Sequence, residues 1–85
     1  MSYAVSFLPA ARRHFLGLPA SLRSRLQKHI DALEDNPRPP GVKKLKGQRD
    51  HWRIRVGDWR IIYTIEDREL IVLVLRIGNR REVYR

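Results

Sequence analysis

Cysteine is absent from this 85-residue chain, which excludes a disulfide framework and a thiolate metal site. The three histidines, His14, His29 and His51, are scattered and lack the spacing of metal ligands. We therefore expect neither a metal nor another cofactor. A chain of this length predicts one domain, residues 1–85, with a modest core. A cysteine-free chain is compatible with a reducing cytoplasm, which is the location that we expect.

Long apolar runs are also missing. The longest, "LIVLVLRI" at residues 70–77, is eight residues long and contains Arg76, so it predicts a buried strand and is far too short to cross a bilayer. The first residues, "MSYAVSFLPAARR", carry no basic segment ahead of their short apolar run. We therefore expect neither a secretory signal nor insertion into a membrane.

Acidic residues are scarce. The chain has 9 Asp and Glu against 18 Lys and Arg, a net charge of +9 and a pI near 11.1. This balance favours a nucleic acid, an anionic membrane or an acidic protein as partner, and it does not specify the fold.

The first part of the sequence predicts a strand followed by two helices. In "SYAVSFL", Tyr3, Val5 and Phe7 alternate with smaller residues, as in a half-buried strand. Pro9 suits the first turn of a helix that runs to about Gly17. A second helix begins near "PASLRSRL" and ends before "NPRPPG", whose prolines cannot continue it. Its apolar stripe has four members, spaced four, four and three apart: Leu22, Leu26, Ile30 and Leu33.

Residues 51–63, "HWRIRVGDWRIIY", predict a β-hairpin. Gly57 and Asp58 form a two-residue loop, and Gly in the first loop position suits a type II′ turn. This turn sets the register of five facing pairs: Val56 with Trp59, Ile54 with Ile61, Trp52 with Tyr63, Arg55 with Arg60 and Arg53 with Ile62. One face of the hairpin is therefore apolar and most simply part of the core, and the other is cationic.

The pairing of Arg55 with Arg60 is unfavourable unless something compensates it. Like charges directly opposite each other destabilise a sheet, and arginine cannot lose its proton to relieve the repulsion. Two arginines that splay apart into water would satisfy the pattern. A bound anion would satisfy it better.

The predicted fold class is α+β. An N-terminal strand and a two-helix hairpin pack on the apolar side of a mainly antiparallel, twisted sheet, in the order β-α-α-β-β-β, with three or four strands after the helices. The strand at 70–77 has two apolar faces, and "EDRE" allows a loop of two, three or four residues before it. The register and the inward face of this strand therefore stay open.

Cationic residues gather around the hairpin in the sequence. The candidate site consists of His51, Arg53, Arg55 and Arg60 in the hairpin, Lys43, Lys44 and Lys46 before it, and Arg80, Arg81 and Tyr84 after the last long strand. Guanidinium groups match phosphate geometry and keep their charge, so they suit binding of a nucleic-acid backbone and stabilisation of a phosphoryl transition state.

The order "KLKG", "WRIRVGDWRIIY", an apolar strand and "RIGNRREVYR" resembles the RelE toxin family, within the RelE/ParE superfamily of type II toxin-antitoxin systems. The resemblance spans nearly the whole chain, and the combination of "RVGDWRIIY" with "GNRREVY" is its most specific part. It implies a RelE-like fold and a toxin that enters the ribosomal A site and cuts messenger RNA there. It also implies a RelB-like antitoxin as partner, with ribosome and mRNA as the targets.

In the family, cleavage is metal-independent: the ribose 2′-hydroxyl attacks the adjacent phosphate and leaves a 5′-hydroxyl downstream. The resemblance implies phosphate-stabilising roles for Arg60 and Arg80 and an orienting or proton-accepting role for Tyr84. Arg53 and Arg55 stand where studied members have lysines. A lysine with a lowered pKa can act as a base, whereas arginine stays protonated. Tyr84 is therefore the expected base, with His51 as an outside candidate.

Two other functions stay open at this point. ParE-like toxins share the fold and inhibit DNA gyrase without nuclease chemistry. A non-catalytic RNA-binding or ribosome-binding module would fit the charge equally well.

Overall fold

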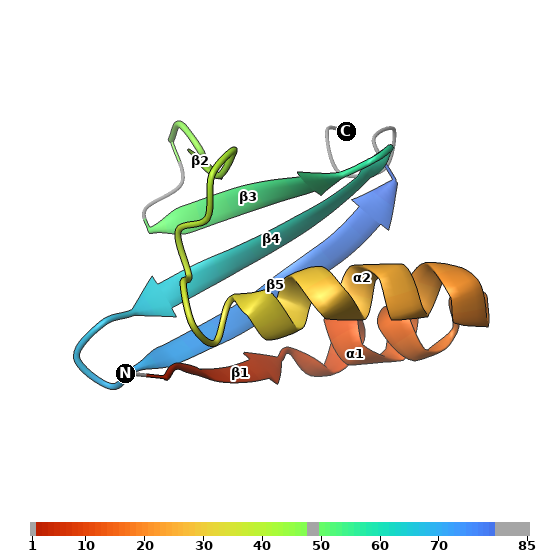
Figure 1. Ribbon diagram of the computed structural model, residues 1–85, viewed down its shortest axis with the longest axis horizontal. Coiled ribbons are helices and arrows are strands. Elements are labelled where there is room, and N and C mark those ends of the chain that lie inside the picture. Colours follow the sequence, from red (N-terminus) through yellow and green to blue (C-terminus); the bar gives the residue numbers. More distant parts are fainter. Residues whose placement is uncertain (1, 48–49, 80–85) are drawn as a thin grey trace.

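The computed structural model describes residues 2–47 and 50–79, and these residues form a five-stranded sheet with two helices (Figure 1). The elements in chain order are β1 (Ala4–Phe7), α1 (Pro9–Leu16), α2 (Ala20–Ala32), β2 (Lys43–Lys44), β3 (His51–Val56), β4 (Trp59–Glu66) and β5 (Ile71–Asn79). The predicted α+β class and element order are confirmed, and the short strand β2 ahead of the hairpin brings the strands after the helices to four, the larger of the two predicted numbers.

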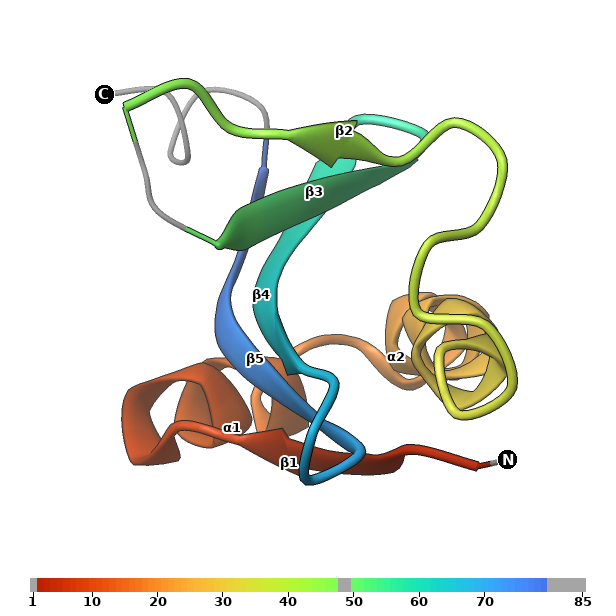
Figure 2. The same cartoon turned by 90° about the vertical axis from the view of Figure 1, so that its left-hand side faces the viewer.

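The strands lie in the order β1-β5-β4-β3-β2. Only β1 and β5 run parallel among the described pairs, and the other three pairs are antiparallel. Figure 2 shows this order from bottom to top, with both helices beside the lower half of the sheet. The upper strands β2 and β3 therefore lie farthest from the helix hairpin.

Both helices form where the sequence predicts them. Pro9 opens α1, and Gly17 ends it, with its amide donating to the carbonyls of Arg13 and His14. Phe15 of α1 contacts Phe7 of β1, with ring centroids 5.4 Å apart. The contact joins the first helix to the edge strand directly before it.

The core lies between α2 and the apolar face of the sheet. Leu26, Ile30 and Leu33 are fully buried, as the apolar stripe predicts, and Leu22 packs at the margin of the core. From the sheet, Tyr63 is buried completely, whereas the two tryptophans of the hairpin are partly buried against the same cluster. The assignment of these aromatics to the core is confirmed.

The hairpin adopts the predicted register at every position. Arg55 pairs with Arg60, Arg53 with Ile62, and the apolar pairs fall on the opposite face. Gly57 has φ +61°, whereas the φ angle of Asp58 is not positive. A type I′ turn needs positive φ at both positions, so the angles agree with the predicted type II′ turn.

A β-bulge decides the inward face of β5. Tyr63 pairs with Val74, but its neighbour Ile62 pairs with Arg76, so Leu75 is an extra residue on the β5 side. Val72 and Val74 face the core before the bulge, and Ile77 faces it afterwards. The loop before β5 has four residues, 67–70, which is the longest of the three predicted lengths.

Among the described residues, no helix is both long enough and apolar enough to cross a membrane.

Candidate functional site

The face of the sheet opposite the helices carries two rows of basic side chains. The first row crosses four strands through the paired positions Lys43, Arg53, Ile62 and Arg76. The second row, two residues along, consists of Arg55, Arg60 and Gly78. Within the strands β3, β4 and β5 themselves, Glu66 at the far end of β4 is the one acidic side chain, and Asp58 lies in the hairpin turn at the end of the second row, so the two rows are predominantly positive.

Arg60 differs from its neighbours in the cationic face because it is buried, with 3% of its surface exposed. One guanidinium nitrogen, Nη1, donates to the carbonyl oxygens of Trp59 at 3.1 Å and Gly57 at 3.4 Å. Arg55 opposite it is exposed. The two arginines therefore lie at different depths, with Arg60 held against the hairpin turn.

The three lysines before the hairpin do not act as one group. Lys43 pairs with Arg53 and shares its face, whereas Lys44 pairs with Trp52, and its Nζ lies 5.8 Å from the centroid of the Trp52 ring on the other face. Lys46 follows in the exposed turn after β2. Lys44 therefore lies on the opposite face from Lys43, because successive strand residues point to opposite faces. The RNA-binding role expected of the three lysines stays a prediction.

His51 lies at the first position of β3, opposite Thr64 and partly exposed. His51, Arg53 and Arg55 are alternate residues of β3, so their side chains point to the same face of the sheet. Within residues 2–47 and 50–79, no three His, Cys, Asp or Glu side chains are grouped as metal ligands would be. The described arginines of this face supply fixed positive charge and hydrogen-bond donors but no proton acceptor.

The predicted residues Arg80, Arg81 and Tyr84 lie outside the described residues. Their roles stay predictions. The last described residue, Asn79, pairs with Trp59 beside the hairpin turn, so β5 ends next to the Arg55 and Arg60 row.

Arg76 belongs to the cationic face and was not among the predicted site residues. Its sequence signal is a charge inside an apolar run, but strict alternation with Val72 and Val74 would turn it toward the core. The bulge at Leu75 reverses that alternation and leaves Arg76 exposed beside Ile62.

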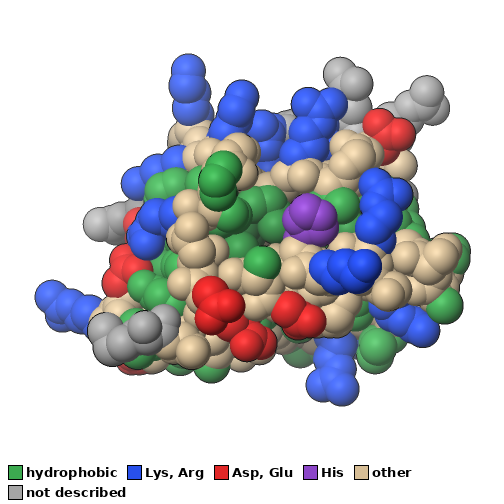
Figure 3. All heavy atoms as spheres, in the orientation of Figure 1, with side chains coloured by type: hydrophobic (Ala, Val, Ile, Leu, Met, Phe, Trp, Pro, Cys, Tyr) green, Lys and Arg blue, Asp and Glu red, His purple; other side chains and the backbone are tan. Residues whose placement is uncertain are grey.

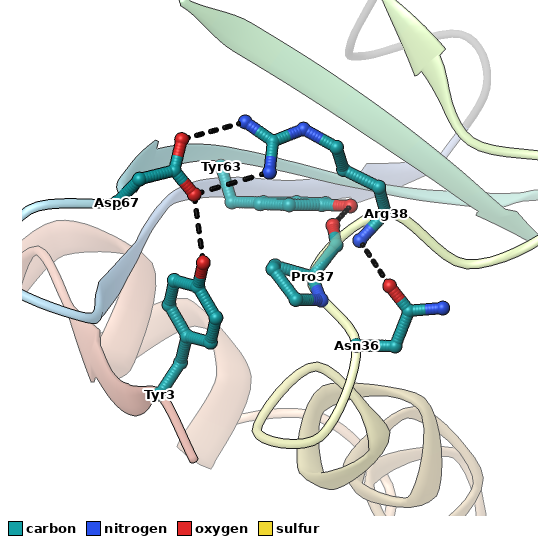
Figure 4. A network of polar contacts seen from close by, with 6 residues as sticks. All are labelled: Tyr3, Asn36, Pro37, Arg38, Tyr63 and Asp67. Carbon is teal, nitrogen blue, oxygen red and sulfur yellow. Dashed lines mark hydrogen bonds and ion pairs between the residues drawn. The ribbon is translucent and has the colours of Figure 1, made fainter. Parts of the chain in front are cut away.

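A second polar cluster anchors the proline-rich loop on the helix side (Figure 4). Arg38 forms a two-pronged ion pair with Asp67, at 3.0 and 3.1 Å, and Tyr3 donates its hydroxyl proton to the same carboxylate at 2.7 Å. Hydrogen bonds from Arg38 and Tyr3 lower the pKa of Asp67. Arg38 also lies 5.0 Å from the centroid of the Trp52 ring. These contacts join β1, the loop after α2 and the β4–β5 turn, so we assign them a structural role.

Tyr63 anchors the same loop from inside the core. Its hydroxyl donates to the carbonyl oxygen of Pro37 at 2.6 Å, and burial raises the pKa of the phenol. The phenol therefore stays protonated at physiological pH and acts as a permanent donor.

Charge is unevenly distributed on the helix side of the molecule. Figure 3 shows basic side chains along the upper edge, over β2 and β3, and acidic side chains gathered at the lower left, over the end of α2. The acidic residues of that segment are Asp31, Glu34 and Asp35. In this view the acidic cluster at the end of α2 lies apart from the basic side chains over β2 and β3.

Comparison with known proteins places this arrangement in a family context. Residues 5–84 match the model of the family described as ParE toxin of type II toxin-antitoxin system, parDE. The mRNA interferase toxin RelE of Escherichia coli is 28% identical over 88 residues, which cover 99% of this chain and 92% of that protein. Toxin RelG of Mycobacterium tuberculosis is 30% identical over 86 residues, which cover 100% of this chain and 99% of that toxin.

Solved structures agree with the sequence matches. A chain in the crystal structure of the archaeal RelE–RelB complex from Pyrococcus horikoshii is similar with a TM-score of 0.81 and 29% identity, covering 94% of this chain and 97% of that chain. The family match spans nearly the whole sequence and the fold agrees with it. The chain therefore belongs to the RelE/ParE superfamily of type II toxin-antitoxin toxins.

Proposed function

We propose that this toxin is a ribosome-dependent endoribonuclease that cuts messenger RNA in the ribosomal A site and so inhibits translation. The observation that carries the proposal is the convergence of Arg53, Arg55, Arg60 and Lys43 on one face of the sheet. The similarity to a relative named mRNA interferase supports the same activity.

The proposed reaction is a metal-independent phosphoryl transfer from the 5′-oxygen of one nucleotide to the 2′-oxygen of the preceding one. The ribose 2′-oxygen gives its proton to a base and attacks the adjacent phosphorus, the bond from phosphorus to the 5′-oxygen breaks, and that oxygen leaves as a hydroxyl after gaining a proton. Extra negative charge develops on the phosphate during this step. Preorganised cations stabilise that charge most effectively.

Each residue has a distinct proposed role. Arg60 is proposed to stabilise the charge of the reacting phosphate from its buried position against the hairpin turn, where two carbonyls hold its guanidinium, and exposed Arg55 is proposed to contact that phosphate. Arg80 is proposed to stabilise the same phosphate, and Tyr84 to orient or deprotonate the 2′-hydroxyl, as the family resemblance implies. His51 is the alternative base. Arg53 is proposed to belong to the catalytic set with Arg55 and Arg60, and Lys43, Lys46 and Arg81 are proposed to hold the flanking RNA backbone.

A RelB-like antitoxin is the proposed protein partner. The similar Pyrococcus horikoshii chain was crystallised as a RelE–RelB complex. The net charge of +9 favours a partner with an acidic segment, which would cover the basic strands and block RNA from the site. We propose that this segment orders only when it binds the toxin.

Primer-extension mapping tests the proposed activity. A defined mRNA is incubated with the protein, with and without ribosomes stalled with an empty A site. Cuts confined to the A-site codon and dependent on the ribosome support the nuclease. RNA that stays intact in every lane refutes it.

Two variants separate chemistry from folding. Arg60→Ala removes the fixed guanidinium, but it also leaves the hairpin-turn carbonyls without their donor, so its Tm must be compared with the wild type. Arg55→Ala removes an exposed guanidinium from the same row and should fold normally. We expect both variants to lose cleavage. A fully active Arg55→Ala would contradict the role proposed for that residue.

Gyrase inhibition is the second candidate, because the matching family is described as ParE toxin. A gyrase inhibitor needs a binding surface, but it needs neither a base for a 2′-hydroxyl nor a proton donor for a leaving oxygen. Tyr84→Phe distinguishes the two: a nuclease that uses the phenol should lose turnover and keep ribosome affinity, whereas a gyrase inhibitor should keep its effect in a supercoiling assay.

A further inference from the structure

The bulge in β5 places an additional arginine on the cationic face. In a regular strand without the bulge, Arg76 would continue the inward series of Val72 and Val74 and meet the core. With it, Ile77 fills the core position and Arg76 is exposed on the outer face. A buried, unpaired guanidinium would be costly, so the bulge makes a charged residue tolerable inside an apolar strand.

Arg76 lies within reach of the proposed reaction centre. Its paired neighbour is Ile62, and Ile62 pairs in turn with Arg53. At the usual strand separation the Cα atoms of Arg76 and Arg53 are about 10 Å apart, and Arg76 lies about 8 Å from Arg60 on a diagonal. Within residues 2–47 and 50–79, the ion pair that forms joins Arg38 to Asp67, and no carboxylate pairs with Arg76.

A hollow adjoins Arg76 on the side of α1. It has a volume of about 450 Å³ and is lined by Ala10, Ala11, His14, Leu75, Arg76, Ile77 and Gly78. Much of this lining is small or apolar, with one exposed imidazole and one guanidinium among it. A hollow of this size and character suits a planar group joined to an anion.

We propose that Arg76 and this hollow form a nucleotide subsite that flanks the phosphate held by Arg55 and Arg60. The Arg76 guanidinium binds the neighbouring backbone phosphate of a single-stranded RNA, and the attached nucleoside enters the hollow between α1 and β5. The inference rests on the proposed nuclease function and extends it. It defines the path of the RNA strand across the sheet, from the hairpin toward α1. Arg76 is a positioning residue and not a catalytic one.

Equilibrium binding of a short single-stranded RNA with 2′-O-methyl riboses tests the subsite without any cleavage. Affinity is measured by fluorescence anisotropy over a series of salt concentrations, using the full chain. For single strands each lost phosphate contact reduces the slope of log K against log salt by about 0.7. We expect this reduction for Arg76→Ser, whereas Arg76→Lys, which keeps the charge, should retain the slope.

Two further variants control the result. Arg68→Ser removes an equal charge from the exposed β4–β5 turn and should leave the slope unchanged. Ala10→Phe fills the hollow from an exposed position of α1, and it should weaken binding without changing the slope. In the ribosome assay, Arg76→Ser should raise KM and leave kcat unchanged, because uniform binding is lost.

The outcomes separate the subsite from the nuclease. If the wild type cuts mRNA but Arg76→Ser matches Arg68→Ser in both slope and KM, the subsite is overturned and the nuclease stands. If no mRNA is cut but the slope depends on Arg76, the proposed nuclease fails and the RNA subsite stands.

Discussion

Tyr63→Phe removes one hydroxyl from the centre of the fold, and its effect can be worked out from a single contact. The side chain is fully buried, and its hydroxyl donates to the carbonyl oxygen of Pro37 at 2.6 Å. Loss of a typical net hydrogen bond costs about 1 kcal/mol, and the desolvated carbonyl left behind adds at least as much, so we expect a loss of about 2 kcal/mol in the free energy of unfolding.

Thermal unfolding followed by circular dichroism measures this loss. For a domain of this size, 1 kcal/mol corresponds to about 4–8 °C in Tm, so Tm should fall by about 10 °C. The matched control is Tyr3→Phe, whose hydroxyl bonds to Asp67 in an exposed network and should change Tm little. Equal Tm values for the two variants would refute the argument that burial makes the Tyr63 bond matter. RNA binding below Tm should be unaffected in both.

Three further predictions concern the turn, the polar network and the core. Gly57→Ala should destabilise the protein by about 1–2 kcal/mol in urea unfolding, because a non-glycine residue is strained at φ +61°; the Arg25 guanidinium, whose Nη2 lies 2.5 Å from the position of the new Cβ, can move aside at little cost. An unchanged midpoint would contradict this. Asp67→Asn should lower stability at neutral pH. Because the folded-state pKa of Asp67 is depressed, its contribution is present above the unfolded-state value of about 3.9 and disappears as pH falls through the folded value, so variant and wild type should converge in acid; a constant difference down to low pH would speak against the linkage. Leu26→Ala should cost about 3 kcal/mol by leaving a cavity, whereas Leu16→Ala, at a residue that is 54% exposed, should cost far less; similar losses would disprove the assigned core.

Much of the fold could be predicted because its signals are local. The two-residue loop at Gly57 and Asp58 sets the hairpin register, and period-two alternation then divides its side chains between two faces. The helix ends follow from Pro9, Gly17 and the prolines after residue 35, which act through backbone geometry alone. None of these inferences needs to know what packs against the element.

The candidate site was only partly predictable, because its residues depend on pairings between distant segments. The composition and the hairpin pattern alone determined a cationic sheet face, since charge and alternation are properties of the sequence, and they predicted no more than an anionic partner. Tertiary structure decided which side chains share that face. Pairing with β3 sends Lys43 and Lys44 to opposite sides, and the hairpin turn holds Arg60 in a buried position that its sequence does not signal. The bulge in β5 exposes Arg76, because one extra residue reverses the alternation from which the face of a strand is predicted.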